Sequence, residues 1–372
     1  MPDPSVSEKA LKPYVFVTLN GPDDGGDFGP HTPGTKTSGL QEALDYAHRH
    51  CRDVYIFGGR GGLHQGQSNN CNVYWLDETL RVPWSQDFRL DGGNYLLVYR
   101  KPTGYAVTID SQMNCRYKFG LIVSQSRDAA VCICPRTAGP DDFVLITASI
   151  FDFSAVVSGH PEGTAILIDS RHGPIINSQF FFEEFNAQGV GMHVSDAGGD
   201  GHPVTTNRIE VMFGNQRHAR DRCIGLRLGD PGSRHIVDNK IAMSFHAPQG
   251  AHFDTEKKRY VTAQPYEPHS ALGADIFAQR NLMTFWFSGR RARGQDLVFE
   301  PDSRDNTVFA FDLPNGITNK ARVPSNRVVP CGPVGFAVTT PPVPPSGRPV
   351  QNRNPYPVQV LVLAPGRRGP KD

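Results

Sequence analysis

The sequence feature that most constrains the fold is a short theme that recurs between Thr164 and Leu313. Each copy contains an alternating apolar run, a turn, and then an Asn that opens a second apolar run, as in residues 207–213 and 281–287. The Asn residues in this position are Asn177, Asn207, Asn239, Asn281 and Asn306. Successive members lie 30, 32, 42 and 25 residues apart, and recurrence at such a period indicates stacked structural units.

The repeats have the pattern of short strands. Each holds two or three runs of about five residues that are rich in Val, Ile, Phe and Met and alternate with period two, with Gly, Asp, Asn and Pro between them. Winding such strands as successive rungs of a parallel β-helix buries one face of each strand and satisfies its backbone groups through the neighbouring rungs. An Asn at the same turn of every rung can then form a ladder of side-chain hydrogen bonds. The predicted fold class is therefore all-β, a single-stranded parallel β-helix in which these Asn residues are structural.

One segment near the N-terminus has the periodicity of a helix instead. Its apolar positions recur at i, i+3, i+4 and i+7, and Thr37 or Ser38 is a candidate N-cap. Those positions are Leu40, Ala43, Leu44 and Ala47. Because the end of a β-helix exposes unpaired core, we expect this amphipathic helix to act as a cap.

Changes of composition divide the chain into three parts. Residues 1–78 are predicted to form the strand and helix cap, and residues 79–325 the β-helix. An insertion at residues 247–273 breaks the repeat, and long loops on a rigid solenoid tend to form the walls of a binding face. Residues 326–372 are a Pro-rich C-terminal β extension, and its lone apolar strand at residues 357–363 must pair with its own chain or with a neighbouring subunit. We therefore predict a homotrimer.

The order of elements near the N-terminus resembles a known signature. A strand, an Asp- and Gly-rich loop at residues 23–27, the helical run at residues 40–47 and a strand at residues 54–56 are similar to the opening of the pectate-lyase-like superfamily of β-helices. The resemblance implies a right-handed coil. At the other end, a Pro-Ser-Gly turn at residues 345–347 followed by a strand resembles the small C-terminal β elements of trimeric β-helix proteins.

Charge and composition exclude several classes of partner. The chain has 38 basic and 37 acidic side chains and a net charge of +1, so no global field recruits nucleic acid or an anionic membrane. No stretch approaches the roughly 20 apolar residues of a membrane span, and the polar N-terminus lacks a signal-peptide pattern. A cytoplasmic location is expected, with secretion open if a leader has been removed. The seven cysteines have neither zinc-ligand nor disulfide-framework spacing.

The candidate catalytic residues are acids on consecutive repeats. Glu183 and Glu184 directly follow a very apolar run, and apolar surroundings raise a carboxyl pKa as a general acid requires. Asp196 lies on the next repeat, and neighbouring rungs stand about 4.8 Å apart, so a carboxylate pair across rungs is available. Glycosidic cleavage uses two carboxyl groups about 5–9.5 Å apart. The arrangement is similar to that of the trimeric inulin fructotransferase family, which implies a glycoside hydrolase or a glycosyl-transferring enzyme with a site near the subunit interface.

Further polar and aromatic residues are candidates for substrate binding, and no cofactor is predicted. They are Asp200, His193, His202, His218, Trp286 and Arg290. Four other aspartates directly follow strands with an alternating pattern. Asp in such a turn accepts local backbone hydrogen bonds, so these four are interpreted as turn residues. They are Asp91, Asp110, Asp169 and Asp230. Asp196 can share this role.

Two other functions stay open on the sequence. A polysaccharide lyase acting on uronic-acid glycans needs a base and a positively charged cluster, and in that case alone Ca²⁺ is a candidate ligand. The basic residues available are Lys257, Lys258, Arg259, Arg290, Arg291 and Arg293. A non-catalytic glycan-binding or structural trimer needs neither feature. An oligo- or polysaccharide is the predicted partner whether the enzyme is a glycoside hydrolase or a lyase.

Overall fold

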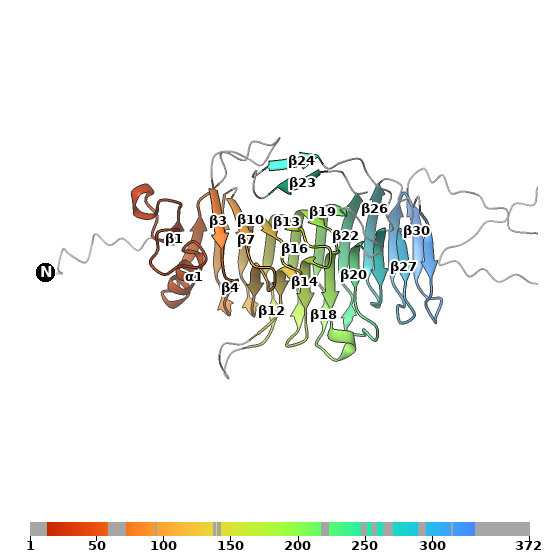
Figure 1. The fold of residues 1–372 in the computed structure, drawn as a ribbon. Helices are drawn as coiled ribbons and strands as arrows, with labels where there is room; N and C mark the ends of the chain where they lie inside the picture. The colour runs from red at the N-terminus through yellow and green to blue at the C-terminus, as the bar shows by residue number, and fades with distance from the viewer. Residues whose placement is uncertain are drawn as a thin grey trace, which may run out of the picture.

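The computed structural model describes residues 13–58, 72–93, 95–136, 139, 143–216, 223–246, 251–254, 259–262, 271–288, 295–313 and 315–331. Over these residues the strands form three long parallel sheets, called sheets A, B and C here, which run along a common axis (Figure 1). The prediction of an all-β chain with parallel strands is confirmed.

Sheet A contains the longest strands. In spatial order it consists of β1 (Tyr14–Val17), β2 (Asp53–Ile56), β6 (Arg89–Gly92), β10 (Arg116–Ser124), β13 (Ile150–Ser158), β16 (Gln179–Ala187), β19 (Arg208–Gln216), β22 (Lys240–His246), β26 (Leu282–Ser288), β28 (Thr307–Phe311) and β30 (Arg327–Cys331). Two more strands, β3 (Asn72–Leu76) and β7 (Tyr95–Tyr99), pair with each other, and β7 also pairs with β10.

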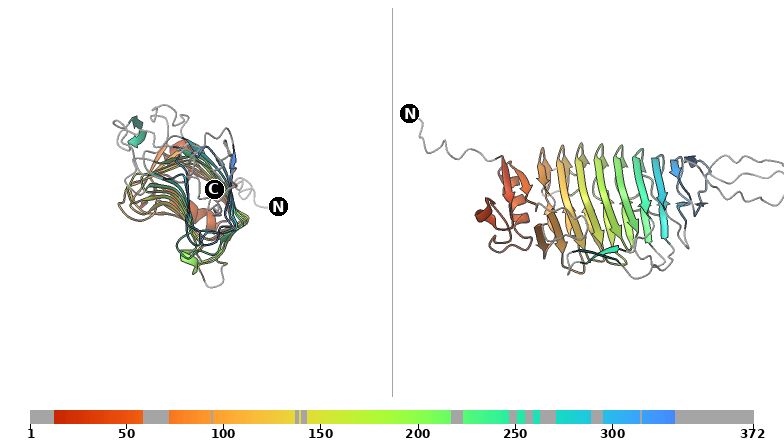
Figure 2. Two further views of the ribbon diagram at one scale, coloured as in Figure 1. Left: turned by 90° about the vertical axis from the view of Figure 1, so that its right-hand side faces the viewer. Right: turned by 90° about the horizontal axis from the view of Figure 1, so that it is seen from above.

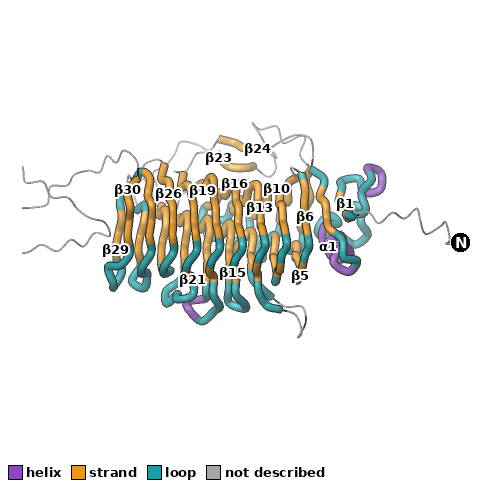
Figure 3. Tube along the Cα trace, turned by 180° about the vertical axis from the view of Figure 1, so that it is seen from behind, coloured by secondary structure: helices purple, strands orange, loops and turns teal. Residues whose placement is uncertain are grey.

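Sheets B and C are built from shorter strands. Sheet B consists of β4 (Leu80–Val82), β8 (Val107–Ile109), β11 (Ala129–Ile133), β14 (Thr164–Asp169), β17 (Val190–Ser195), β20 (Cys223–Leu228), β25 (Ala271–Ile276), β27 (Leu297–Phe299) and β29 (Ile317–Asn319). Sheet C consists of β5 (Ser85–Gln86), β9 (Gln112–Met113), β12 (Ile146–Thr147), β15 (Ile175–Ile176), β18 (Val204–Thr205) and β21 (Ile236–Val237). Seen from behind, the sheet C strands lie along the edge opposite β16 and β19 (Figure 3).

The chain visits the three sheets in a fixed order. From β10 to β22 it passes through sheets A, B and C in turn, and each strand pairs with the strand at the same position in the next repeat. Phe151 of β13, for example, lies opposite Tyr117 of β10 on one side and Phe180 of β16 on the other. In the end-on view the strands of successive repeats therefore lie over one another (Figure 2). Backbone hydrogen bonding between repeats satisfies the described strands of sheets A, B and C, which pair in parallel and not as local hairpins.

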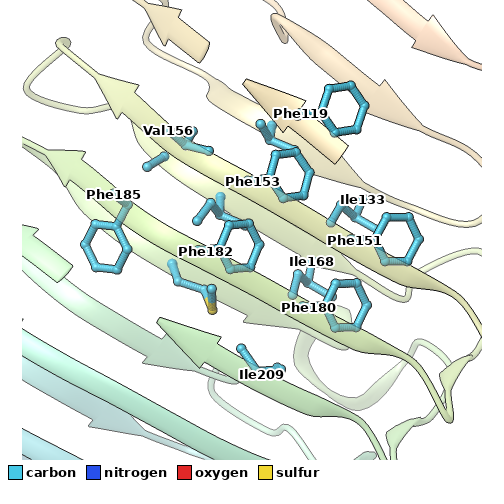
Figure 4. Close-up of a cluster of buried hydrophobic side chains, with 14 of the residues drawn as sticks. Phe119, Ile133, Phe151, Phe153, Val156, Ile168, Phe180, Phe182, Phe185 and Ile209 are labelled. Atoms are coloured by element: carbon cyan, nitrogen blue, oxygen red, sulfur yellow. The ribbon is translucent and has the colours of Figure 1, made fainter. Parts of the chain in front are cut away.

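Columns of aromatic rings fill part of the core. Phe151 and Phe180 stack with their ring centroids 5.0 Å apart and their planes 5° apart, and Phe153 and Phe182 stack at 5.0 Å and 11° (Figure 4). Such pairs contribute about 0.5–1.5 kcal/mol beyond the area that they bury. They also fix the register, because a slip of one residue would turn each ring to the opposite face of its strand.

A buried ladder of hydrogen bonds runs along the corner between sheets C and A. In each repeat a side-chain oxygen accepts the backbone N–H of the corresponding residue in the preceding repeat. The members are Ser149, Ser178, Asn207, Asn239, Asn281, Asn306 and Asn326. The predicted structural role is therefore confirmed for the four Asn residues from Asn207 to Asn306.

Asn177 does not belong to this ladder, and its predicted role is corrected. Its side chain is exposed, and its backbone has a φ of 49°, in the left-handed region. Thr206 and Asp238 occupy the same position in the next repeats, each with a φ of 58°. Asn tolerates this conformation better than most residues, so the Asn at 177 serves the turn and the next residue, Ser178, enters the ladder.

The predicted helix is present as α1 (Leu40–Arg49), beside β1 and β4 at the N-terminal end of the stack (Figure 1). Its four periodic apolar residues are buried. The N-cap is Gly39 rather than Thr37 or Ser38. Thr37 still contributes, because its hydroxyl accepts the N–H of Gln41 at 3.0 Å. No helix among the described residues is long and apolar enough to cross a membrane.

The predicted insertion contains an antiparallel hairpin of β23 (Ala251–Asp254) and β24 (Arg259–Thr262), which projects from the stack (Figure 1). Lys257 and Lys258 lie outside the described residues. At the C-terminal end β30 pairs with β28. The strand predicted at residues 357–363, on which the trimer prediction depends, also lies outside the described residues.

Candidate functional site

Three polar side chains stand in one row on the outer face of sheet B. In β17, β20 and β25, the residues on either side of His193, Arg227 and Asp275 are buried in the core, so alternation turns these three side chains outward. The register places His193 opposite Arg227, and Arg227 opposite Asp275. Because adjacent strands lie about 4.8 Å apart, the three side chains are close enough to contact one ligand.

Asp230 joins this row from the turn that follows β20. Gly229 has a φ of 95° there, a conformation that favours glycine. Asp230 Oδ1 accepts a hydrogen bond from Nε2 of His193 at 3.1 Å, and Oδ2 accepts one from the Ser195 hydroxyl at 2.6 Å. The Arg227 guanidinium lies 3.6 Å from Oδ1. Burial opposes ionisation, but the His193 contact, the hydroxyl and the guanidinium outweigh it and lower the pKa of Asp230 to about 2.

Asp275 has the opposite electrostatic environment. Only 8% of the residue is exposed, and its Oδ1 is buried without a hydrogen-bond partner in the part of the chain that the structure describes. Burial, then the charge of Glu300 and a hydrogen bond to it, raise the pKa of Asp275 to about 7 against the opposing charges of Arg227 and Lys320. Lys320 Nζ donates to Glu300 Oε1 at 2.7 Å. Asp275 is thus mostly protonated below a pH of about 7.

Arg227 lies between these two environments. Its guanidinium stands 5.5 Å from the ring centroid of Phe277, a cation–π contact that fixes its orientation. Its charge acts on both Asp230 and Asp275. Its Nε is buried and donates to no other described residue. Arg227 therefore favours the ionised form of both carboxyl groups and retains an unused N–H donor.

The two aspartates consequently differ in protonation between a pH of about 2 and a pH of about 7. Asp230 is ionised, and Asp275 keeps its proton up to a pH of about 7. Two titratable groups whose environments push their pKa values apart are characteristic of acid–base sites. The arrangement can donate a proton from one carboxyl group while the other accepts a proton or stabilises positive charge.

The acids predicted from the sequence are not brought together. Glu183 and Glu184 belong to β16 of sheet A, whereas Asp196 follows β17 of sheet B. Asp196 is fully buried, and its carboxylate accepts the backbone N–H groups of Arg234 at 3.0 Å and His235 at 2.9 Å. This carboxylate ties two turns together and faces away from solvent.

The predicted binding residues fall in several places. His193 lies in the sheet B row, whereas Asp200 and His202 are exposed on the loop that leads from sheet B to sheet C. Trp286 lies on the outer face of sheet A, and 42% of it is exposed. His218 and Arg290 lie outside the described residues.

Sequence reasoning missed Asp230 and Asp275 for different reasons. Asp230 occupies a position where turn chemistry alone explains an Asp, and only the contact with His193 distinguishes it. Asp275 interrupts an apolar run at an outward position, and a charged residue in such a run can indicate a functional site. Its importance depends on alignment with His193 and Arg227, and the long insertion before β25 hides that alignment.

No protein-family model and no curated protein matches this sequence. Among the described residues, no group of three or more His, Cys, Asp and Glu side chains is placed to hold a metal ion. The outer face of sheet B around Asp230 and Asp275 is the candidate active site, because it combines an ionised and a protonated carboxyl group in one row.

Proposed function

We propose that the protein is a carbohydrate-active enzyme that cleaves or transfers glycosidic bonds on the outer face of sheet B. Under this proposal the three sheets close into a right-handed parallel β-helix of the pectate-lyase-like class. The cyclic order of the sheets and the side-chain ladder support the coil. The opposite protonation of Asp230 and Asp275 is the observation that carries the chemistry.

The two aspartates take separate roles in this mechanism. Asp275 donates its proton to the glycosidic oxygen, so the bond to the leaving sugar breaks as an alcohol forms. Asp230, ionised and held by His193, accepts a proton from the water or sugar hydroxyl that attacks the anomeric carbon. Arg227 stabilises the ionised form of Asp230 before this transfer. The proton lost by Asp275 is thereby balanced by the one that Asp230 gains.

The extent of the polar face supports an oligo- or polysaccharide as the substrate. Asp169 at the end of β14 lies in register with Ser195, which contacts Asp230, so polar groups continue into the preceding repeat. Arg171 Nε donates to Asp169 at 2.5 Å. Asp169 and Ser195 are themselves buried, but Arg171, His193 and Arg227 are partly exposed in successive repeats. Such a series of donors fits a chain of sugar hydroxyls better than it fits one small ligand.

The proposal is tested by assaying the full-length chain on a panel of neutral and acidic glycans, with Asp275→Asn and Asp230→Asn. Each variant should lower kcat by about 10²–10⁴-fold, the usual contribution of a positioned acid or base. Asp23→Asn, at an exposed position in the N-terminal cap, serves as the control. Turnover that survives both substitutions in folded protein would rule out this site.

A polysaccharide lyase is the second candidate, favoured by the cations of Arg227 and Lys320 beside the two aspartates. These cations would neutralise the carboxylate of a uronic-acid residue and so acidify the proton next to it. Elimination leaves an unsaturated sugar that absorbs in the ultraviolet, whereas hydrolysis leaves a new reducing end. Measuring both products on the same acidic glycans separates the two reactions.

Binding without turnover is the third outcome that the panel distinguishes. A non-catalytic glycan-binding or structural protein would retain glycans in an affinity assay while neither product accumulates.

The homotrimer also remains a proposal. Light scattering on the full chain and on a chain ending after β30, at Cys331, tests whether the C-terminal extension carries the assembly.

A further inference from the structure

A second group of chemically capable side chains lies on the outer face of sheet A, on a different face from the aspartate row. A groove of about 420 Å³ opens there across β16, β19, β22 and β26. It is lined by Phe181, Phe182, Glu183, Glu210, Val211, Met212, Ala242, Ser244 and Trp286. This volume lies within the range of about 300–1,000 Å³ that is usual for small-molecule sites.

A β-bulge shapes the groove. The register between β19 and β22 shifts between Val211 and Gly214, so Met212 and Phe213 together stand where one residue of β22 stands. Both side chains consequently point outward, with 61% of Met212 and 46% of Phe213 exposed. Bulges are often used beside active sites to redirect side chains. Here the bulge provides one apolar wall, and Trp286 provides the facing one.

A serine and a histidine meet at this groove. Ser244 and His246 are two residues apart in β22, so both project from the same face of the strand. The Ser244 hydroxyl lies 2.9 Å from Nε2 of His246. Ser244 also lines the groove, so its oxygen can reach a bound ligand. A hydroxyl in hydrogen-bond contact with an imidazole is the arrangement that activates a serine nucleophile.

The imidazole packs against an aromatic ring and lies within the influence of a carboxylate. Phe213 packs against it, with ring centroids 5.3 Å apart. On the neighbouring strand, Asn215 stands in register with His246 and donates from Nδ2 to Glu184 Oε1 at 2.7 Å. Burial lowers the pKa of His246 more than the charge of Glu184 raises it, so the imidazole is neutral at neutral pH and can accept a proton. Glu184 thereby gains a role different from the one predicted from sequence.

We propose that Ser244, His246 and Glu184 form a second active site, which hydrolyses carboxylic esters bound in the groove between Met212 and Trp286. Ser244 Oγ attacks the ester carbonyl carbon as its proton passes to Nε2 of His246. The bond to the alcohol then breaks, and the alcohol leaves with that proton. Water hydrolyses the acyl-serine by the reverse transfers, releasing the carboxylic acid. Glu184 acts on the imidazole through its negative charge and is a supporting residue rather than a catalytic one.

The walls of the groove indicate the class of ester. Trp286 stacks on Phe311 at 5.3 Å with 10° between planes, so its exposed face is a rigid platform. A flat or alkyl group packs favourably against such a face. Esters with a short alkyl or aromatic acyl group fit this space, including acyl groups attached to a sugar hydroxyl.

The test is covalent labelling of the full chain with a fluorophosphonate, followed by peptide mapping. Attack by Ser244 Oγ on phosphorus expels fluoride, and His246 takes the hydroxyl proton. We expect the label on Ser244 and turnover of p-nitrophenyl butyrate. Ser244→Ala should abolish both, and His246→Gln should slow labelling by about 10²-fold or more. Thr284→Ala, a hydroxyl on the neighbouring strand β26, is the matched control and should label like the parent chain.

Labelling at another residue, no labelling, or equal labelling with and without His246 would overturn the proposal. Unfolding midpoints of the variants separate lost chemistry from lost structure. Glu184→Gln, which keeps the hydrogen-bonding shape, should shift the pH profile of labelling because the imidazole loses the nearby negative charge. The proposals for the two sites can be tested independently of each other. Asp275→Asn leaves this groove unchanged, and Ser244→Ala leaves the aspartate row unchanged.

Discussion

The carboxyl group of Asp275 in β25 is buried on the outer face of sheet B, where the negative charge of Glu300, the residue that follows β27, acts on it. Burial and then this charge disfavour the ionised form of Asp275 and raise its pKa to about 7. This environment creates both the proposed general acid and a measurable dependence of stability on pH.

The pH dependence of glycosidic cleavage should have its basic limb near the pKa of Asp275. The reactive form needs a protonated Asp275 and an ionised Asp230, whose pKa values are about 7 and about 2. We expect kcat/KM to fall about tenfold per pH unit above a pH of about 7. Steady-state rates across this range check the prediction. A rate that rises above neutral pH would instead assign a base to this position, as the lyase requires.

Replacing Asp275 with Asn should change the pH dependence of stability. The folded-state pKa of Asp275 is raised from 3.8 to about 7, so folding binds a proton in this interval and wild-type stability falls as pH rises through it. Asn imitates the neutral acid at every pH. The variant should match wild type at low pH and exceed it by about 2–4 kcal/mol above a pH of about 7. Urea unfolding at several pH values measures this, with Asp23→Asn as a control that should follow wild type.

The ladder residue Asn281 should be sensitive to truncation. Its Oδ1 accepts the backbone N–H of Asn239 at 3.0 Å, and its Nδ2 donates to the carbonyl oxygens of Gln279 at 2.7 Å and Ile236 at 3.0 Å. Asn281→Ala leaves these buried groups unpaired and should cost roughly 3–5 kcal/mol of unfolding free energy. Gln179→Ala, at an exposed amide in sheet A, should change it by less than about 0.5 kcal/mol. Equal effects of the two substitutions would contradict a structural ladder.

Asp196 should prove structural, although the sequence made it a catalytic candidate. Its buried carboxylate accepts hydrogen bonds from Ser233 and from the N–H groups of Arg234 and His235. Asp196→Ala should lower the unfolding free energy by about 2–4 kcal/mol while folded protein keeps its kcat. Asp200→Ala, at the nearby exposed acid, should affect neither. A stable but inactive Asp196→Ala variant would restore the catalytic assignment.

The general form of the fold follows from local patterns that a single sequence displays. Alternation in short runs decides which side chains face the core, as at Phe180 and Phe182, because successive residues of a strand point to opposite faces. The recurrence of Asn at one turn indicates the ladder. At residues 177 and 178 the same pattern misleads by one position, since Asn suits both the left-handed turn residue and the ladder position that follows it.

The composition of the site was decided only by the tertiary structure. The sequence by itself determined that His193, Arg227 and Asp275 face outward, because alternation is a local property. It could not determine that they face one another, because loops of unequal length separate β17, β20 and β25 and the register across them is set by packing of the whole stack. The pKa values of Asp230 and Asp275 depend on those distant neighbours and on burial, so their opposite protonation exists only in the folded chain.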